Sequence, residues 1–475
     1  MTDCKIDSIE FQAHNHKQVV AQFNGGNITS DAGSILLRQT DQRIGLLKRF
    51  AACFSDDRNP ELIEHTVLDL VSQRTYGICC GYEDLNDHDD LRHDRLLALL
   101  VGKADVEGND RRRESDQGIA LAGKSTLNRL ELIPQVSGEY HRYHRISYDP
   151  LKVDALMANL FLESFETPPE KIVLDLDTTD DPLHGNQEGR FFNGYYDCYC
   201  YTPLYVFCGE HLLLSRIQTA NVDGAANAVV EIKQIIEKIR QKWPEVKIVV
   251  RGDSGFCREE LMTWCEANDV FFLLGMGKNE RLLKKAKRQI SKSKRRYYGN
   301  KQPTRRFATF MYRTQKSWSC SRQVVCKAEH LEKGANPRFV VTNLKGDDFV
   351  TPQFLYEKIY CARGDMENRI KEQQMDMFAD RTSTAVMRSN QLRMYFSAMA
   401  YILMQSLRRI GLQGTDFAKA QCGTLRVKLM KIGAQIKITA RRILLSLASA
   451  CPYAKIFYQA WLNLNASLKT AVAVT

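Results

Sequence analysis

Two aspartates stand at positions where a carboxylate can hold a metal ion. Asp177 ends the apolar run IVLDLD, and Asp253 ends a second run, IVVRGD. Both runs predict buried strands, and a rigid strand fixes a carboxylate at its end beside an open loop. Mg²⁺ prefers oxygen ligands of this kind. Arg251 and Ser254, which flank Asp253, are expected to shape the loop. The alternative for each Asp is a turn or a helix N-cap, which is the commoner use.

A third acid, Glu367, lies in the segment YEKIYCARGDMENRIKEQQMD, which predicts a helix. At about 100° per residue, five polar side chains share one stripe about 80° wide: Tyr360, Arg363, Glu367, Lys371 and Gln374. Such a stripe could be a solvated face, but Ile359 and Ile370 indicate that the helix also packs. Asp365 and Glu372 point away from the stripe, so Glu367 is the candidate ligand.

Other titratable residues near the first aspartate compete for the same role. Asp175 lies two residues earlier, on the same face of the strand. Asp177 is preferred because it is nearer the strand end and directly precedes Thr-Thr. Asp180 and Asp181 are expected to be turn acids, and His184 a structural residue.

The elements that must position these residues follow from hydrophobic periodicity. Residues 1–150 predict mainly helices, and residues 171–276 predict strands and helices in the order β-β-β-α-β-α-β. That order predicts an α/β fold with a mixed sheet and flanking helices. Residues 307–344 predict further strands, and helical periodicity dominates from Pro352 to the C-terminus.

The charge of the 475-residue chain is uneven, although its formal net value is only +11. Residues 281–328 contain sixteen Lys and Arg and no acid, and residues 408–475 contain eleven against a single acid, Asp416. The rest of the chain is net acidic. Cationic segments attract polyanions by releasing their counterions, and aromatic residues lie among the charges of the first segment. Nucleic acid is the favoured partner, with a solvated face or an anionic membrane surface as alternatives. Six cations of the first segment are the candidate DNA contacts: Lys284, Lys285, Lys287, Arg288, Arg295 and Arg296.

Composition excludes several classes of protein. Hydrophobic residues make up 44% and charged residues 26%, which is ordinary for a globular protein. No apolar run reaches the roughly 20 residues that span a bilayer, and the first residues lack the pattern of a secretory signal. The 14 cysteines are too sparse for a disulfide scaffold and match no zinc spacing. Reduced thiols, no membrane partner and a cytoplasmic location are therefore expected.

These motifs together resemble the DDE transposases of bacterial insertion sequences. The resemblance rests on Asp177-Thr-Thr, on Asp253 at a strand end, and on Tyr360, Arg363 and Glu367 at the spacing of the insertion sequence 4-related group. The blocks GYEDLND, LRHD, STLNRLE, LDLDTTDDPLHGNQ and RGDSGF also resemble insertion sequence family 1380. One position departs from the signature, because Gln374 stands where the family has Lys.

The resemblance implies a fold and a division of the chain. Members have an RNase H-like core, a mixed five-stranded sheet with helices, whose first and fourth strands present the two Asp and whose later helix presents the Glu. A β-rich insertion precedes that helix. The expected parts are a helical DNA-binding region (1–150), the first part of the core (151–278), the basic β-rich insertion (279–350), the Glu-bearing part of the core (351–410) and a basic helical region (411–475).

The resemblance also implies an activity. Asp177, Asp253 and Glu367 would hold two Mg²⁺ ions, with Mn²⁺ as a possible substitute, for hydrolysis at the ends of an insertion sequence and joining of the 3′-OH to target DNA. Tyr360, Arg363 and Lys371 would contact DNA near the metals, and double-stranded DNA would bind a homodimer at the bacterial nucleoid. A metal-dependent nuclease without strand transfer and an inactive, transposase-derived DNA-binding protein are the alternatives.

Overall fold

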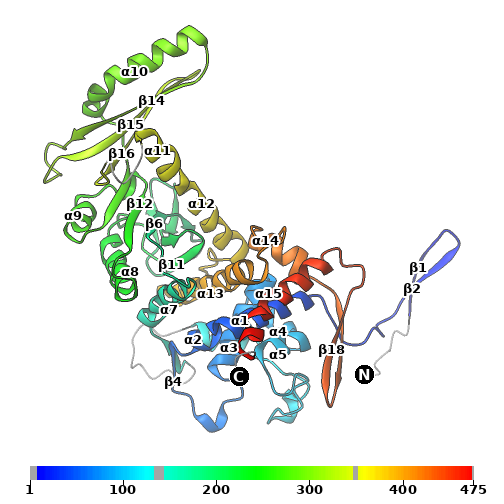
Figure 1. Cartoon of the computed structure of the whole chain (residues 1–475). Coiled ribbons are helices and arrows are strands. Elements are labelled where there is room, and N and C mark those ends of the chain that lie inside the picture. The colour runs from blue at the N-terminus through cyan, green and yellow to red at the C-terminus, as the bar shows by residue number, and fades with distance from the viewer. Residues whose placement is uncertain (1–7, 133–143, 346–350, 473–475) are drawn as a thin grey trace. The chain divides into compact units, whose positions relative to one another are not determined.

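The computed structural model describes residues 8–132, 144–345 and 351–472. The chain divides into two compact units (Figure 1). The sheet unit comprises residues 52–55 and 131–402, and the terminal unit comprises residues 1–51, 56–130 and 403–475. The two ends of the chain, which the sequence assigned to separate regions, therefore share one unit.

A single mixed sheet of eight strands forms the centre of the sheet unit. In spatial order the strands are β11 (His211–Arg216), β10 (Leu204–Cys208), β6 (Lys171–Thr178), β12 (Lys247–Gly252), β13 (Phe271–Met276), β16 (Gly334–Thr342), β15 (Arg322–Leu331) and β14 (Thr304–Tyr312). The three central strands β6, β12 and β13 are parallel, and all other neighbours are antiparallel. Leu176 pairs with Gly252, and Gly252 pairs with Leu274, so the carboxyl ends of the parallel strands meet at one edge.

The large sheet has eight strands, three more than the five expected of the core. The chain order of strands and helices from β6 to β13 agrees with the sequence, but the strands after β13 do not form a separate insertion. Strand β16 pairs with β13, so the hairpins β14–β15–β16 extend the same sheet. Apolar side chains lie on both faces of these strands and can pack on each side. The strands can therefore continue the sheet.

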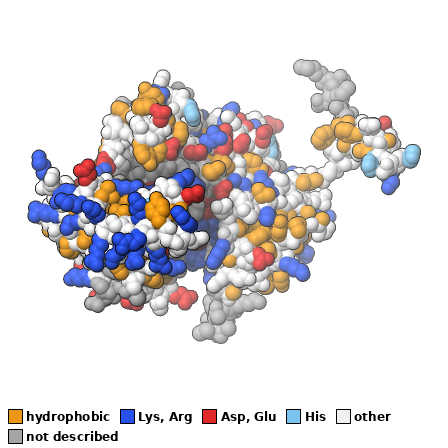
Figure 2. Space-filling model, turned by 90° about the horizontal axis from the view of Figure 1, so that it is seen from above, with side chains coloured by type: hydrophobic (Ala, Val, Ile, Leu, Met, Phe, Trp, Pro, Cys, Tyr) orange, Lys and Arg blue, Asp and Glu red, His pale blue; other side chains and the backbone are white. Residues whose placement is uncertain are grey.

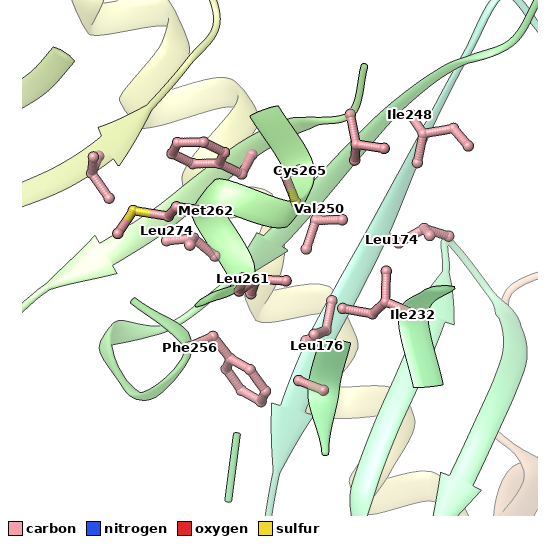
Figure 3. Close-up of a cluster of buried hydrophobic side chains, with 14 of the residues drawn as sticks. Leu174, Leu176, Ile232, Ile248, Val250, Phe256, Leu261, Met262, Cys265 and Leu274 are labelled. Carbon is pink, nitrogen blue, oxygen red and sulfur yellow. The ribbon is translucent and has the colours of Figure 1, made fainter. Parts of the chain in front are cut away.

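One face of the sheet is covered by α8 (Ala228–Lys242) and α9 (Glu259–Ala267). Figure 3 shows Leu174 and Leu176 of β6, Val250 of β12 and Leu274 of β13 in one apolar cluster with side chains of these helices. Phe256, from the short turn η4 (Ser254–Phe256), closes the cluster beside the strand ends. Because side chains alternate along a strand, Asp175 and Asp177 lie on the opposite face.

The opposite face is covered by an irregular helical run. Its parts are α11 (Pro352–Phe354), the π-helical turn η6 (Leu355–Tyr360), the 3₁₀ turn η7 (Cys361–Arg363), α12 (Gly364–Lys371) and the π-helical turn η8 (Glu372–Asp376). Leu355 and Tyr356 pack there against Val249 of β12 and Leu273 of β13. The long helix α13 (Met387–Ser406) follows, and the boundary between the units falls within it.

The remaining elements of the sheet unit are short strands and one more helix. Strands β7 (Asp181–Pro182), β9 (Cys198–Tyr201) and β8 (Phe191–Asn193) form a small sheet directly after β6, and β4 (Phe54–Asp56) pairs with β5 (Ile146–Tyr148). Helix α7 (Pro150–Glu163) begins at the N-cap Asp149, whose carboxylate accepts from the backbone of Leu151.

The basic insertion was expected to be β-rich, but it also contains a long helix. It opens with α10 (Glu280–Asn300), a helix of 21 residues that packs on β14 and β15. Asn279 caps this helix by accepting from the backbone N–H of Leu282 at 2.9 Å. Leu282, Ala286 and Ser293 are buried at helical spacing, so only one stripe of α10 faces the sheet.

The terminal unit contains both helices and strands, although its end regions were expected to be mainly helical. Its helices are α1 (Ile35–Ile44), α2 (Leu46–Ala51), α3 (Val67–Cys80), α4 (His88–Leu91), α5 (Arg95–Val101), α6 (Lys124–Glu131), α14 (Cys422–Leu425) and α15 (Ala454–Val472). Strands β1 (Ile9–His14) and β2 (Lys17–Ala21) form a hairpin. Strands β3 (Ile28–Thr29), β17 (Ala434–Thr439) and β18 (Arg442–Leu447) form a three-stranded sheet that joins the two ends of the chain.

No helix within residues 8–132, 144–345 or 351–472 is both long enough and apolar enough to span a membrane.

Candidate active site

The three candidate acids lie at the carboxyl edge of the large sheet, and two of them share a cation. Asp177 lies near the end of β6, and Asp253 immediately follows the neighbouring parallel strand β12. Glu367 lies on α12, which contacts β6. Residues 76 to 190 positions apart in the sequence therefore lie at one edge through strand pairing and one packed helix.

The guanidinium of Arg363 spans two of these acids. Its Nη1 donates to Asp177 Oδ2 at 2.9 Å, and its Nη2 donates to Glu367 Oε1 at 2.7 Å. The side chain of Asp177 is 15% exposed and that of Glu367 is 48% exposed, so the pair opens to solvent on the helix side. A single cation thus lies between two carboxylates.

The pKa of the Asp177 carboxyl lies above its ordinary value. Burial raises its pKa to about 6; Arg363 opposes that effect, whereas the negative charges of Asp253 and Glu367 reinforce it. The direction has a physical meaning, because three clustered acids repel one another and favour any cation that can enter. Burial lowers the pKa of Arg363, but the charges of Asp177 and Glu367 outweigh that effect and leave it raised.

Tyr360 reaches the same edge because β13 carries a glycine there. A Cβ atom on Gly275 would stand 2.5 Å from Tyr360 Oη and 2.9 Å from the backbone nitrogen of Ser254. Only a residue without a side chain leaves room for the phenol beside the Asp253 loop. Burial raises the pKa of Tyr360, so its hydroxyl stays protonated at neutral pH. Sequence reasoning missed Gly275, whose role depends on a contact with a residue 85 positions away.

Asp175, the competing candidate ligand, is held in an ion pair. Arg251 binds its carboxylate with Nε and Nη2, the latter at 2.7 Å from Oδ2, and also donates to the carbonyl of Ile359. Asp175 and Arg251 are both buried. This ion pair joins β6, β12 and the helical run, and it holds the Glu367 segment over the sheet. Arg251 therefore does more than shape its own loop.

The five-residue stripe is only partly reproduced. The segment contains π-helical and 3₁₀ turns, so the regular 100° advance assumed from the sequence does not hold throughout. Arg363 and Glu367 do share a face, as their hydrogen bond shows. Gln374, at the position where the signature has Lys, donates to the carbonyl of Asp180 at 3.0 Å. Lys371 is exposed.

Two further polar residues come from the segment that follows β6. Tyr196 donates to the carbonyl of Thr178, next to Asp177, at 3.3 Å. Asp181 was expected to be a turn acid; it is buried, and Thr382 donates to it at 2.9 Å. Burial raises the pKa of Asp181 to about 8, and the hydrogen bond from Thr382 only partly offsets this. His184 is exposed and was expected to be structural.

The donor set suits a hard divalent cation, although the side chains are not gathered around one. Among the described residues, no three His, Cys, Asp or Glu side chains converge closely enough to hold a metal ion. The oxygens of Asp177 and Glu367 instead face a guanidinium. Carboxylates that already share a cation have the charge and the ligand type that Mg²⁺ or Mn²⁺ requires.

The six predicted DNA contacts all lie on α10 and are exposed. All six lie outside the buried stripe of the helix: Lys284, Lys285, Lys287, Arg288, Arg295 and Arg296. Figure 2 shows Lys and Arg side chains gathered over this part of the molecule. We call these six residues the basic face.

Most aromatic residues of the insertion serve packing and do not offer stacking surfaces. Tyr312 and Trp318 are buried against each other, with ring centroids 5.6 Å apart. Phe307 packs against Tyr356, and Phe310 against Phe339. Tyr298 is 56% exposed, and it alone among these interleaved aromatics keeps a large free surface in the described chain.

The second cationic segment is also partly structural. Arg408 is buried, and Arg426 donates to the carbonyl of Cys79 at 3.0 Å. Lys431 pairs with Asp31 at 2.6 Å. Charge counted along residues 408–475 therefore overstates the charge available to a partner.

Comparison with known proteins identifies a relationship along nearly the whole chain. Residues 11–469 match the family described as Transposase DDE domain group 1. No match was found among curated proteins.

Proposed function

The chain belongs to the Transposase DDE domain group 1 family, and from this premise we propose that it is an active DDE transposase of an insertion sequence. The observation that carries the proposal is the meeting of Asp177, Asp253 and Glu367 at one sheet edge, with Arg363 between two of them. The same motifs favour insertion sequence family 1380 within the family. The substrate is double-stranded DNA at the bacterial nucleoid.

The proposal includes an RNase H-like core. The five strands β11-β10-β6-β12-β13 form one end of the sheet, with β6, β12 and β13 parallel. The first and fourth of these in chain order are β6, which contains Asp177, and β12, which ends just before Asp253. Strands β14 to β16 and α10 are then an elaboration of that core.

Asp177, Asp253 and Glu367 are the proposed ligands of two Mg²⁺ ions, with Mn²⁺ as a possible substitute. When bound, such ions stabilise the charge that develops on the oxygens of phosphodiester substitution. The pKa of about 6 leaves Asp177 mainly ionised at pH 7 to 8, as a ligand must be.

The chain's own cations and hydroxyls orient the DNA. Arg363 is free to exchange a carboxylate for a phosphate oxygen, because guanidinium binds both in the same two-pronged way. Tyr360 presents a protonated hydroxyl beside the Asp253 loop. Water attacks first and frees a 3′-OH at the element's end, and that hydroxyl then attacks target DNA. Lys371 contacts the backbone further out, and Gln374 supports the turn at Asp180 instead of supplying a charge.

DNA binding is assigned mainly to the basic face of α10. All six of its cations are exposed on one helix, where they can follow a phosphate backbone. The terminal unit is the proposed reader of the terminal inverted repeats. Two ends must be cut and joined together, so a homodimer on DNA is part of the proposal.

The experiment that tests the proposal uses the full chain, Mg²⁺ and a duplex carrying the inverted repeats that flank its gene, together with a supercoiled target plasmid. Cleavage at the repeat ends followed by joined products would support transposition. Cleavage without joining would favour the metal-dependent nuclease, and binding without cleavage would favour the inactive DNA-binding protein. The intact set of three acids argues against the last reading.

A further inference from the structure

A cationic groove in the terminal unit collects sequence segments that the carboxylate site does not use. Two adjoining cavities of about 150 and 440 Å³ share four lining residues, His65, Arg111, Asp116 and Thr126. Their walls come from LRHD at 91–94, DRRRESD at 110–116 and STLNRLE at 125–131. We call the joined cavities the arginine groove.

The lining is strongly biased toward one side chain. Six arginines border the groove against three acids, Glu64, Asp89 and Asp116. The arginines are Arg58, Arg92, Arg111, Arg112, Arg113 and Arg129. Arg112 and Arg113 are exposed, and neither makes an ion pair with any acid in the described part of the chain. Arg112 and Arg113 therefore give the groove positive charge that no ion pair of the described residues offsets, whereas Arg58 is paired with Asp56.

The floor of the groove is rigid. Arg111 pairs with Glu64 at 2.8 Å, and its Nη1 donates to His65 Nε2 at 2.5 Å. Arg58 is held by Asp56 at 2.7 Å and donates to the carbonyl of His65 at 3.0 Å. These bonds fix two guanidinium groups before any ligand arrives, which lowers the entropy cost of binding.

A buried donor at the groove lacks an acceptor. His65 is 5% exposed, and burial together with the nearby Arg111 lowers its pKa to about 3. Since Nε2 of this neutral ring accepts from Arg111, Nδ1 carries the proton. Nδ1 is buried and has no hydrogen-bond partner among the described residues. An oxygen with negative charge in the groove would satisfy it.

The start of α6 contributes a second kind of anion-binding group. Gly123, Ser125 and Thr126 line the smaller cavity at the N-terminus of this eight-residue helix. The backbone N–H of Lys124 already donates to Asp89 Oδ1 at 3.0 Å, so this helix end does bind a carboxylate oxygen. Hydroxyls of Ser and Thr, helix N-termini and arginines are the groups that contact DNA phosphates.

We propose that the arginine groove binds backbone phosphates of double-stranded DNA, at a site separate from the basic face of α10. The inference rests on the proposed function, since it supplies that function with a DNA contact in the terminal unit. It specifies phosphate as the group bound. Arg112 and Arg113 provide the mobile contacts, whereas Arg58 and Arg111 provide the fixed ones.

The test measures binding of the full chain to a fluorescent duplex across a range of KCl concentrations. The double variant Arg112→Ala/Arg113→Ala removes two exposed cations and should lower the slope of log affinity against log salt by about 2, since each lost phosphate contact costs about 0.9. The matched control Lys48→Ala/Lys152→Ala removes two exposed cations that do not line the groove. It should leave the slope within about 0.3 of the wild-type value.

A second pair of variants tests the start of α6 without removing a cation. Ser125→Asp should weaken duplex binding about tenfold or more, because it places a negative charge against a phosphate, whereas Ser125→Ala should change it less than about threefold. Duplex binding could be unchanged in Arg112→Ala/Arg113→Ala and in Ser125→Asp while neutralisation of α10 still lowers the slope. That result would overturn phosphate binding by the arginine groove and leave the transposase proposal standing. A wild-type chain that binds no duplex at any salt would instead overturn the proposed function, and the groove with it.

Discussion

The carboxylates of the candidate active site come from positions 177, 253 and 367, whereas the basic face comes from one helix of 21 residues. The carboxylate site depends on strand register and on the ion pair between Asp175 and Arg251, and no other residue replaces any of its three acids. The basic face depends only on a helical period and has six members of the same charge. A site assembled from distant residues should fail at single substitutions, and a locally encoded surface should weaken gradually.

The largest expected effect is the loss of any one acid. Asp177→Asn, Asp253→Asn and Glu367→Gln should each lower the rate of end cleavage about a thousandfold or more, because each removes one charged metal ligand. The matched control is Asp365→Asn on the same helix, which should keep most activity because Asp365 is exposed and is not one of the three candidate ligands. Duplex binding should persist in all four, and an active Glu367→Gln enzyme would disprove the third ligand.

The basic face should respond in proportion to the charge removed. Changing Lys284, Lys285, Lys287 and Arg288 to Ala should lower the salt slope of DNA binding by about 2 to 4, at about 0.9 for each phosphate contact. The control removes four exposed cations of the same unit: Lys152, Lys171, Lys242 and Lys247. An equal fall in both proteins would mean that only net charge matters, and an unchanged slope would make α10 a solvated face.

Gly275→Ala tests whether the acidic site depends on space as well as charge. The new Cβ would lie 2.5 Å from Tyr360 Oη and 2.9 Å from a backbone nitrogen. Overpacking of this kind costs about 1 to 3 kcal/mol of stability, and displacement of Tyr360 should also slow cleavage. Tyr360→Phe in the same chain removes one of the two clashes and should restore part of the lost Tm. If the double variant is no better than Gly275→Ala, the backbone contact alone decides the effect.

The smallest effect on cleavage is expected from the buried Asp181, whose titration changes stability. The pKa of Asp181 is raised from 3.8 to about 8, so between these values the folded chain keeps a proton that the unfolded chain releases. This contribution to stability is complete below pH 4 and is lost as the pH rises through 8. Wild type should therefore lose stability relative to Asp181→Asn over that range, by at most about 1.4 kcal/mol per pH unit. Thermal unfolding at a series of pH values measures the difference, and parallel curves would contradict the assigned burial.

The amino-acid pattern anticipated the order of elements in the core because each strand there is a continuous apolar run. It also identified α10's cations by position, although it predicted no helix in the basic insertion. Charge dominates the segment 281–300 so strongly that the weak apolar stripe of Leu282, Ala286 and Ile290 was overlooked. The number of strands was missed for a different reason: whether β16 pairs with β13 or closes a separate sheet depends on contacts between distant residues.

The sequence by itself determined which residues carry charge and which strands end in an acid, since both are local properties. The sequence preferred Asp177 over Asp175 by position, and only the tertiary structure shows that Arg251 binds Asp175 whereas Arg363 binds Asp177. The tertiary structure also assigned Gly275 its role and buried Trp318, Tyr312 and Arg408, which the sequence counted as available to DNA. Burial and pairing arise from elements distant in the chain, so no local pattern records them.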